Sequence, residues 1–84
     1  MKRIAVIGVV LENPPESQDE FNSIVSDYSG IIKGRMGLPF SEHNIGVISL
    51  VVIADMDKIN SFTGKLGKMP DVSVKTVVSK REII

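Results

Sequence analysis

Residues 3–11 read RIAVIGVVL, and residues 45–54 read IGVISLVVIA. Both segments are almost unbroken apolar runs rich in β-branched side chains, which is typical of strands that are buried on both faces. In a small sheet, the central strands meet this condition best. We therefore expect the two segments to lie side by side in the middle of a β-sheet.

The segment that follows the first run breaks the strand and continues as an amphipathic helix. Two consecutive prolines in residues 12–21 (ENPPESQDEF) cannot extend a strand ladder. Ser17 and Glu20 have the spacing of a capping box at a helix start. Apolar side chains then recur at helical spacing in Phe21, Ile24, Val25 and Tyr28. The pattern predicts a helix over residues 18–29, which Gly30 ends in the left-handed conformation.

The rest of the chain supplies two edge strands and a second helix. Residues 31–38 (IIKGRMGL) carry charges that suit an edge strand, which Pro39 is expected to stop. A second helix follows the second apolar run, capped by Asp55 or Asp57 and ended by Gly67 and Pro70. Its apolar positions are Ile59, Phe62 and Leu66. The alternating segment DVSVKTVVS reads as the last edge strand.

The predicted order of elements is β-α-β-β-α-β. Right-handed crossovers turn two such β-α-β units into a four-stranded antiparallel sheet of order 4-1-3-2, with both helices on one face. This is the ferredoxin-like fold of the α+β class. At 84 residues the chain is expected to hold a single domain, residues 1–79, followed by a short tail, residues 80–84.

Both faces of the two central strands are apolar, although the helices can cover only one. Ile4, Val6 and Val10 alternate with Ala5, Ile7, Val9 and Leu11, and the second run repeats this pattern. A contiguous apolar sheet face is rarely left in water. We therefore expect a homo-oligomer, at least a dimer, whose copies meet through the open sheet face.

Composition excludes several classes of function. Ten basic residues balance ten acidic ones, so no net field favours direct binding to nucleic acid or to a membrane surface. The absence of cysteine removes disulfides, thiolate metal sites and cysteine nucleophiles. No segment approaches the length of a membrane span, and no leader pattern is evident, so a cytoplasmic location is expected.

The stretch with the most functional promise is residues 31–46, IIKGRMGLPFSEHNIG. Glu42 and His43 in its polar part offer ligand atoms, but one imidazole makes an incomplete metal site, so we expect no bound metal and no cofactor. Gly34 and Gly37 admit close approach of a ligand or mark a bulge. An enzyme that uses His43, Arg35 and Glu42 is one alternative, and a structural adaptor without a ligand is another.

Three segments carry a resemblance to a known family: GRMGLPF at 34–40, ISLVV at 48–52 and TGKLGKMPDVSVK at 63–75. Across nearly the whole chain the sequence resembles the iron-only hydrogenase system regulators. That resemblance implies an ACT-like ferredoxin fold, similar to the C-terminal domain of the nickel-responsive repressor. It also implies a sensor or regulatory module, which we expect to be non-enzymatic and to bind a small effector or a protein partner.

The resemblance also indicates where an effector would bind and what is missing. The segment comparable to the repressor's nickel site, residues 41–50, offers His43 alone, so we expect neither a nickel site nor the repressor's DNA-binding segment. ACT-like modules tend to bind ligands near the loop after the first strand. This places Glu12 and Asn13 near a possible pocket. Together with residues of the stretch 31–46, the candidate effector-binding residues are Glu12, Asn13, Gly34, Arg35, Met36, Gly37, Glu42 and His43.

Overall fold

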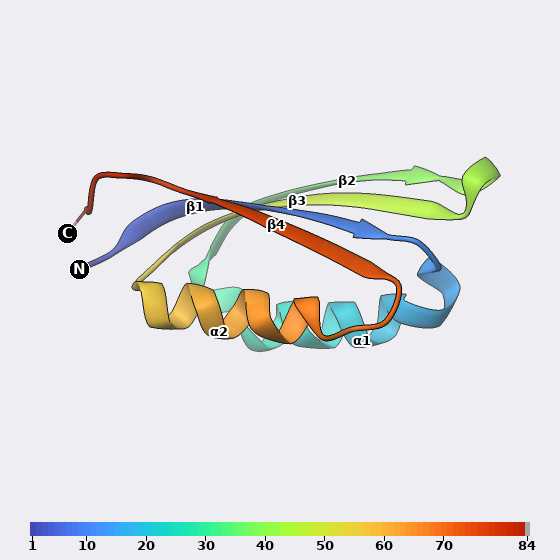
Figure 1. Ribbon diagram of the computed structural model, residues 1–84, viewed down its shortest axis with the longest axis horizontal. Coiled ribbons are helices and arrows are strands. Elements are labelled where there is room, and N and C mark those ends of the chain that lie inside the picture. The colour runs from blue at the N-terminus through green and yellow to red at the C-terminus, as the bar shows by residue number, and fades with distance from the viewer. Residues whose placement is uncertain (84) are drawn as a thin grey trace.

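The computed structural model describes residues 1–83 and has two layers, a sheet and a pair of helices (Figure 1). Along the chain the elements are β1 (Arg3–Leu11), α1 (Pro14–Asp27), β2 (Ile32–Phe40), β3 (Ile45–Ala54), α2 (Met56–Gly67) and β4 (Val72–Val78). Short 3-10 turns, η1 (Ser29–Ile31) and η2 (Ser41–His43), precede and follow β2. Both helices lie against one face of the sheet, and no element of residues 1–83 covers the other face (Figure 1).

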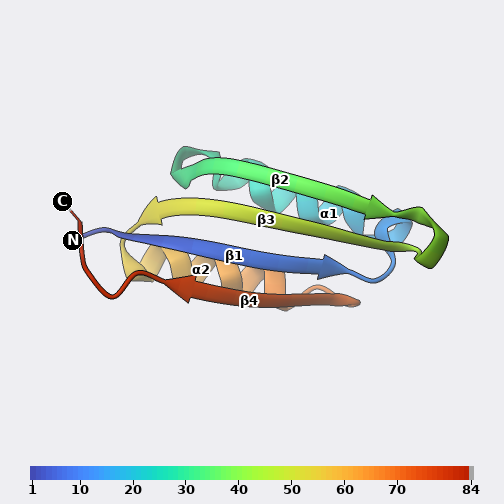
Figure 2. The same ribbon diagram turned by 90° about the horizontal axis from the view of Figure 1, so that it is seen from above.

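The four strands are antiparallel and lie in the order β2-β3-β1-β4 (Figure 2). This is the predicted order read from the opposite edge, and it confirms the ferredoxin-like fold. The two apolar runs occupy the central positions as expected, with Arg3 opposite Ala54 and Leu11 opposite Gly46. The molecule is elongated: it measures 42 Å along its main axis and 18 and 17 Å across it.

The core lies between the sheet and the helices. One set of alternate residues on the central strands is almost fully buried: Ala5, Ile7, Val9, Leu11, Ile48, Leu50, Val52 and Ala54. The helices supply the opposing layer through Phe21, Val25, Tyr28, Ile59, Phe62 and Leu66. Tyr28 stacks on Phe62 with 4.6 Å between the ring centroids, which joins the two helices.

The first helix differs from the sequence prediction at both ends. It begins at Pro14 rather than at residue 18, with Asn13 at the N-cap, and no side chain caps it. The predicted capping box is wrong, because the Ser17 hydroxyl instead donates a hydrogen bond to the carbonyl of Asn13 (3.0 Å). Proline suits the first turn of a helix because the N–H it lacks has no partner there. Gly30 lies in η1, and none of the described glycines has a positive φ, so the left-handed ending is also wrong.

The second strand continues past the proline that was expected to stop it. β2 reaches Phe40, and Pro39 is paired with Gly46 of β3. An edge strand tolerates proline because its outer N–H groups need no ladder partner. The register of β2 against β3 shifts between Ile32 and Gly34, which fits the interpretation of its glycines as marks of a bulge.

The second helix matches its prediction, because the Asp55 side chain accepts a hydrogen bond from the Lys58 N–H (2.9 Å).

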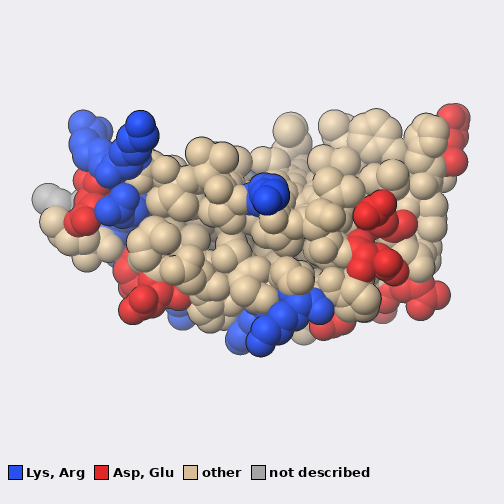
Figure 3. Space-filling model, in the orientation of Figure 1, with Lys and Arg blue, Asp and Glu red and all other residues tan. Residues whose placement is uncertain are grey.

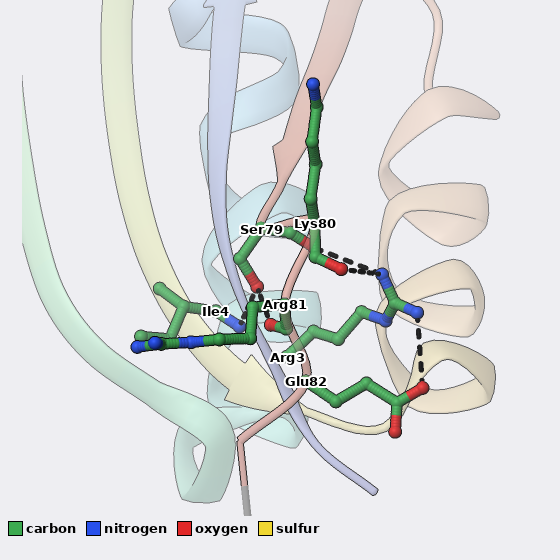
Figure 4. A network of polar contacts seen from close by, with 6 residues as sticks. All are labelled: Arg3, Ile4, Ser79, Lys80, Arg81 and Glu82. Carbon is green, nitrogen blue, oxygen red and sulfur yellow. Dashed lines mark hydrogen bonds and ion pairs between the residues drawn. The ribbon is translucent and has the colours of Figure 1, made fainter.

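The segment after β4 folds back along the start of β1 (Figure 4). Arg3 donates hydrogen bonds to the carbonyls of Ser79 (3.1 Å) and Lys80 (3.3 Å) and forms an ion pair with Glu82 (3.3 Å). Lys2 and Ile83 pair as an isolated antiparallel bridge. Of the five residues expected to form a tail, Lys80, Glu82 and Ile83 are thus bonded to Arg3 or Lys2, and residue 84 lies outside the described residues.

Candidate functional site

At one end of the molecule the β2–β3 hairpin extends past the start of α1 (Figures 1 and 2). A groove lies between them. Its volume is about 560 Å³. The walls are mostly apolar, with Leu11, Pro14 and Pro15 on one side and Leu38, Pro39 and Ile48 on the other. A concave apolar site with a few polar groups is the usual form of a small-molecule site.

Local sequence explains why the groove stays open. Gly37 and Gly46 both line it. A Cβ at Gly37 would lie 3.8 Å from Ile48 Cγ1, and a Cβ at Gly46 would lie 3.6 Å from Pro14 Cγ, which are ordinary contact distances. Packing therefore does not require glycine at either position, and the effect of glycine is to leave space that a side chain would fill.

One hydrogen bond joins the hairpin to the start of α1. Asn44, in the left-handed conformation at φ 56°, donates from its side-chain nitrogen to Asn13 Oδ1 (3.2 Å). Asparagine is among the residues that adopt this conformation at low cost. The contact fixes the two walls of the groove relative to one another.

Arg35 is the one cationic side chain among the groove residues. Its guanidinium donates a hydrogen bond to Asn22 Oδ1 (3.2 Å) and lies 5.7 Å from the centroid of the Phe21 ring. Within residues 1–83 the single ion pair is that of Arg3 with Glu82, so no carboxylate neutralises Arg35. Arg35 therefore places an unpaired positive charge beside an apolar groove.

The start of α1 adds little to the electrostatics of the groove. Pro14 and Pro15 have no N–H group, and the N–H groups of Glu16 and Ser17 donate to the Asn13 carbonyl. A helix start binds anions through free N–H groups, and these are absent or already bonded here. On the side of the molecule seen in Figure 3, the charged side chains at the hairpin end are acidic.

The structure separates the predicted site residues into three places. Arg35 and Gly37 line the groove, and Asn13 lies beside it through its bond to Asn44. Glu12 lies in the loop after β1, where its N–H donates to the Asp71 carbonyl (2.8 Å). The other candidates do not line the groove: Gly34 and Met36 on β2, and Glu42 and His43 in η2.

The arrangement does not assemble the residues of the enzyme alternative. Arg35 bonds to Asn22, whereas Glu42 and His43 are exposed in η2 and have no side-chain hydrogen bond to Arg35 or to each other. Within the described residues no three His, Asp or Glu side chains converge on a possible metal position. The groove residues Pro14, Pro15 and Gln18 were not identified from the sequence. The available signal was the proline pair: a helix that begins at Pro14 carries these three residues in its first turns, which lie beside the hairpin.

The uncovered side of the sheet is a second candidate for a functional surface. We call it the open sheet face, and its large exposed side chains are Ile4, Val6, Met36, Leu38, Phe40, Val47, Val51 and Val77. Directly paired residues of an antiparallel sheet lie on the same face. The pairs Met36–Ser49, Ser49–Gly8 and Gly8–Lys75 therefore form one row across its middle. This row is less apolar than the surfaces on either side of it.

Within residues 1–83, neither helix has the length and apolar character needed to cross a membrane. Among curated proteins, none matches this sequence. Several solved structures do match its fold, and one family matches its sequence.

The solved structure of the uncharacterized protein TM1266 from Thermotoga maritima is 35% identical to this chain. The match has a TM-score of 0.91 and covers 95% of this chain and 100% of that one. The C-terminal domain of the MgtC protein from Mycobacterium tuberculosis is 12% identical, with a TM-score of 0.67 and coverage of 96% and 92%. CPII, a nitrogen regulatory PII-like protein from Thiomonas intermedia K12, is 11% identical, with a TM-score of 0.51 and coverage of 96% of both chains.

The two distant matches show a shared fold and no more. The sequence match is more specific, because one family covers residues 3–76, which include all four strands apart from the last two residues of β4. Both the groove and the open sheet face lie within that range, except for Val77. The chain belongs to the TM1266-like family, described as "Iron-only hydrogenase system regulator, putative".

Proposed function

We propose that this protein is a non-enzymatic regulatory module that works as a homo-oligomer and binds a small effector. The observation that carries the proposal is the open sheet face, an apolar surface on a chain of a regulator family. Regulation would then work through assembly, because an effector that favours one assembly state shifts the population toward it.

The size of the open sheet face supports a second copy of this chain as its partner. A nine-residue strand spans about 30 Å and four strands about 19 Å, so the face measures roughly 550 Å² in projection. Stable protein interfaces bury about 800 Å² on each partner, and accessible area exceeds projected area. One face of this sheet thus approaches what a dimer needs.

Two adjacent valines provide a matched test of this interface. Val51 on the open sheet face is 36% exposed, whereas Val52 on the helix side is fully buried. Val51→Lys is expected to raise the dimer dissociation constant at least about 100-fold and leave a folded monomer, because the new charge would be desolvated in the interface. Val52→Lys is expected to unfold the chain, because it places an ammonium group in the core.

Sedimentation velocity and circular dichroism distinguish these outcomes. A wild-type protein that sediments as a monomer at micromolar concentration would contradict the oligomer. A monomer whose open sheet face is covered by a different protein would instead favour the adaptor alternative.

The groove beside Arg35 is the proposed effector site. Apolar walls and one unpaired guanidinium fit a small molecule that carries a carboxylate on an apolar body. Arg35 is well suited to such a group because its planar fork can bind a carboxylate through two hydrogen bonds. Gly37 forms part of the wall of this site, and Asn13 lies next to it.

A thermal-shift screen of small carboxylates tests this site. We expect hits whose stabilisation is lost in Arg35→Ala and kept in Arg81→Ala, a matched loss of one exposed arginine outside the groove. Filling the groove with Gly37→Leu should abolish the same hits. Hits that survive both changes would remove the groove from the proposal, and turnover that depends on His43 would favour the enzyme alternative.

A further inference from the structure

At the opposite end of the molecule, both ends of the described chain lie near the start of α2 (Figure 1). A second groove lies there. Its volume is about 400 Å³. It forms between segments that are distant in the sequence: the residues before β1, the turn into β2, the end of β3 and the segment after β4. We call it the lysine groove.

Three lysines from three different segments line this groove. Lys2 precedes β1, Lys33 lies at the register shift of β2, and Lys58 is in the first turn of α2. Within the described residues none of them forms an ion pair. The Lys58 ammonium lies 5.6 Å from the centroid of the Tyr28 ring, a contact that leaves its positive charge in place.

The one acidic residue in the lining does not cancel this charge. Asp55 uses its carboxylate to cap α2 by accepting from the Lys58 N–H. Three lysines and one aspartate therefore give the lining a formal net charge of two positive units. A dianion matches this charge better than a monoanion does.

The remaining lining is apolar. Ile31, Ile53 and Ile83 are half-buried and line the groove beside the lysines. Ile83 is held there by its bridge to Lys2 and by the bonds that Arg3 makes to the segment after β4 (Figure 4). At Gly30 a Cβ would meet nothing within 4 Å, so this side of the groove is open.

We propose that the lysine groove binds a small phosphate monoester, with its phosphate group among Lys2, Lys33 and Lys58 and its apolar part on the isoleucines. A phosphate monoester carries about −1.5 to −2 charges at pH 7 and several acceptor oxygens, which suits three separate ammonium donors. A carboxylate would leave one positive charge uncompensated. This site shares no residue with the effector groove, so it stands or fails separately from the proposed effector site.

Titration by NMR with phenyl phosphate, inorganic phosphate and benzoate tests the proposal. Saturable shifts of the amide signals of Gly30, Ile31 and Ile83 are expected for phenyl phosphate. Inorganic phosphate should bind more weakly, because it leaves the isoleucines uncovered, and benzoate more weakly still. Shifts that do not saturate, or that centre elsewhere on the molecule, would overturn the site.

Single lysine changes provide the matched control. Lys33→Ala should weaken phenyl phosphate binding by up to about fivefold, the upper end of the range for one exposed charge pair, whereas Lys68→Ala at the far end of α2 should leave it unchanged. The dispersion of the spectrum verifies folding in each variant, and Lys33→Gln serves if Lys33→Ala does not fold. Equal losses of affinity in Lys33→Ala and Lys68→Ala would show nonspecific electrostatic attraction of phenyl phosphate and contradict the proposal.

Arg3→Ala tests the role of the segment after β4. Arg3 does not line the groove and acts by positioning Ile83. Its loss should bring the affinity for phenyl phosphate down toward that for inorganic phosphate, while inorganic phosphate itself binds as before. A parallel loss for both ligands would contradict this positioning role.

Discussion

The two faces of the sheet are built from the same kinds of residue and have opposite environments. Ile7, Leu50 and Val52 are fully buried beneath the helices, whereas Val6 and Val51, one position away, are 42% and 36% exposed. Strand alternation alone produces this difference, because successive side chains point to opposite faces. An apolar pattern therefore tells which strands are central, while the coverage of each face depends on the other layers of the fold.

The comparison also teaches where function is to be sought. On the helix side, apolar residues are explained by the core they form with Phe21 and Phe62. On the open side, nothing within the described chain explains them. An apolar surface without a structural role within its own chain is the kind that marks an interaction site.

Among the truncations to alanine, Leu50→Ala should produce the largest loss of stability, and it tests the buried face directly. Leu50 is fully buried, so its truncation leaves a cavity, and the free energy of unfolding should fall by about 2–5 kcal/mol. Chemical denaturation of the variant measures this change.

Val51→Ala is the control for that experiment. At a protein concentration at which the chain is monomeric, Val51→Ala should lower the free energy of unfolding much less than Leu50→Ala does. The side chain at position 51 is in contact with water both before and after truncation. Equal losses at the two positions would mean that the open face is covered within a single chain.

The helices that cover the buried face depend on different starts. Asp55 caps α2 through a side-chain hydrogen bond, whereas Asn13 makes no such bond at α1. Asp55→Ala should therefore lower the free energy of unfolding by about 1 kcal/mol, with a range of 0.5–2 kcal/mol. Asn13→Ala should lower the free energy of unfolding by less than Asp55→Ala does, since it removes no helix cap and only the contact with Asn44. A larger loss at Asn13, measured by thermal or chemical unfolding, would contradict this reading of the caps.

Gly8→Ala separates the stability of the monomer from that of the oligomer. Gly8 lies in the middle row of the open sheet face, has no positive φ, and a Cβ there would lie 3.8 Å from the Lys75 carbonyl. Glycine weakens a strand interior, so the change should stabilise the monomer by about 0.4–1 kcal/mol. The free energy of unfolding is to be measured in the Val51→Lys background, where no dimer is expected.

In the otherwise wild-type chain the same methyl group would stand between two packed sheets. The dimer dissociation constant should then rise, although each monomer is more stable. A change that strengthens both the monomer and the dimer would show that the faces do not meet at this row.

The sequence was sufficient for the topology because the two doubly apolar runs identify the central strands without knowledge of the loops. Boundaries were less predictable. The Ser17 and Glu20 spacing suggested a later helix start, yet Pro14 and Pro15 fit the first turn because no partner for their missing N–H is needed there. Pro39 likewise lies within β2 and does not end it, because an edge strand tolerates proline.

The candidate site was only partly predictable for a different reason. Arg35 and Gly37 were identified from the hairpin alone, and they do line the groove. Its other wall comes from the start of α1, and the lysine groove combines residues from both ends of the chain. Such sites depend on which distant segments the fold brings together, and no local pattern contains that information.

The smallest predicted effect concerns Tyr28, on the buried side of the sheet. Its hydroxyl and the Ser61 hydroxyl are 2.7 Å apart, and the ammonium groups of Lys65 and Lys58 lie 5.2 and 5.6 Å from its ring centroid. The Ser61 hydrogen bond chiefly, with the charges of these lysines, lowers the pKa of Tyr28 below its ordinary value of 10.0, against the opposing effect of desolvation.

Tyr28 is the chain's only tyrosine, and no tryptophan is present, so the ultraviolet absorbance of its phenolate reports this group alone. We expect a titration midpoint below 10.0 in the folded protein, which Ser61→Ala should raise more than Lys65→Ala does. Between the folded and unfolded pKa values the unfolded chain holds more protons, so this group adds stability as the pH rises through that window. The contribution is fully present above the unfolded pKa and is lost as the pH falls through the folded pKa. A midpoint at or above 10.0 would show that desolvation outweighs the Ser61 bond, and that Tyr28 belongs more completely to the buried layer than its polar contacts indicate.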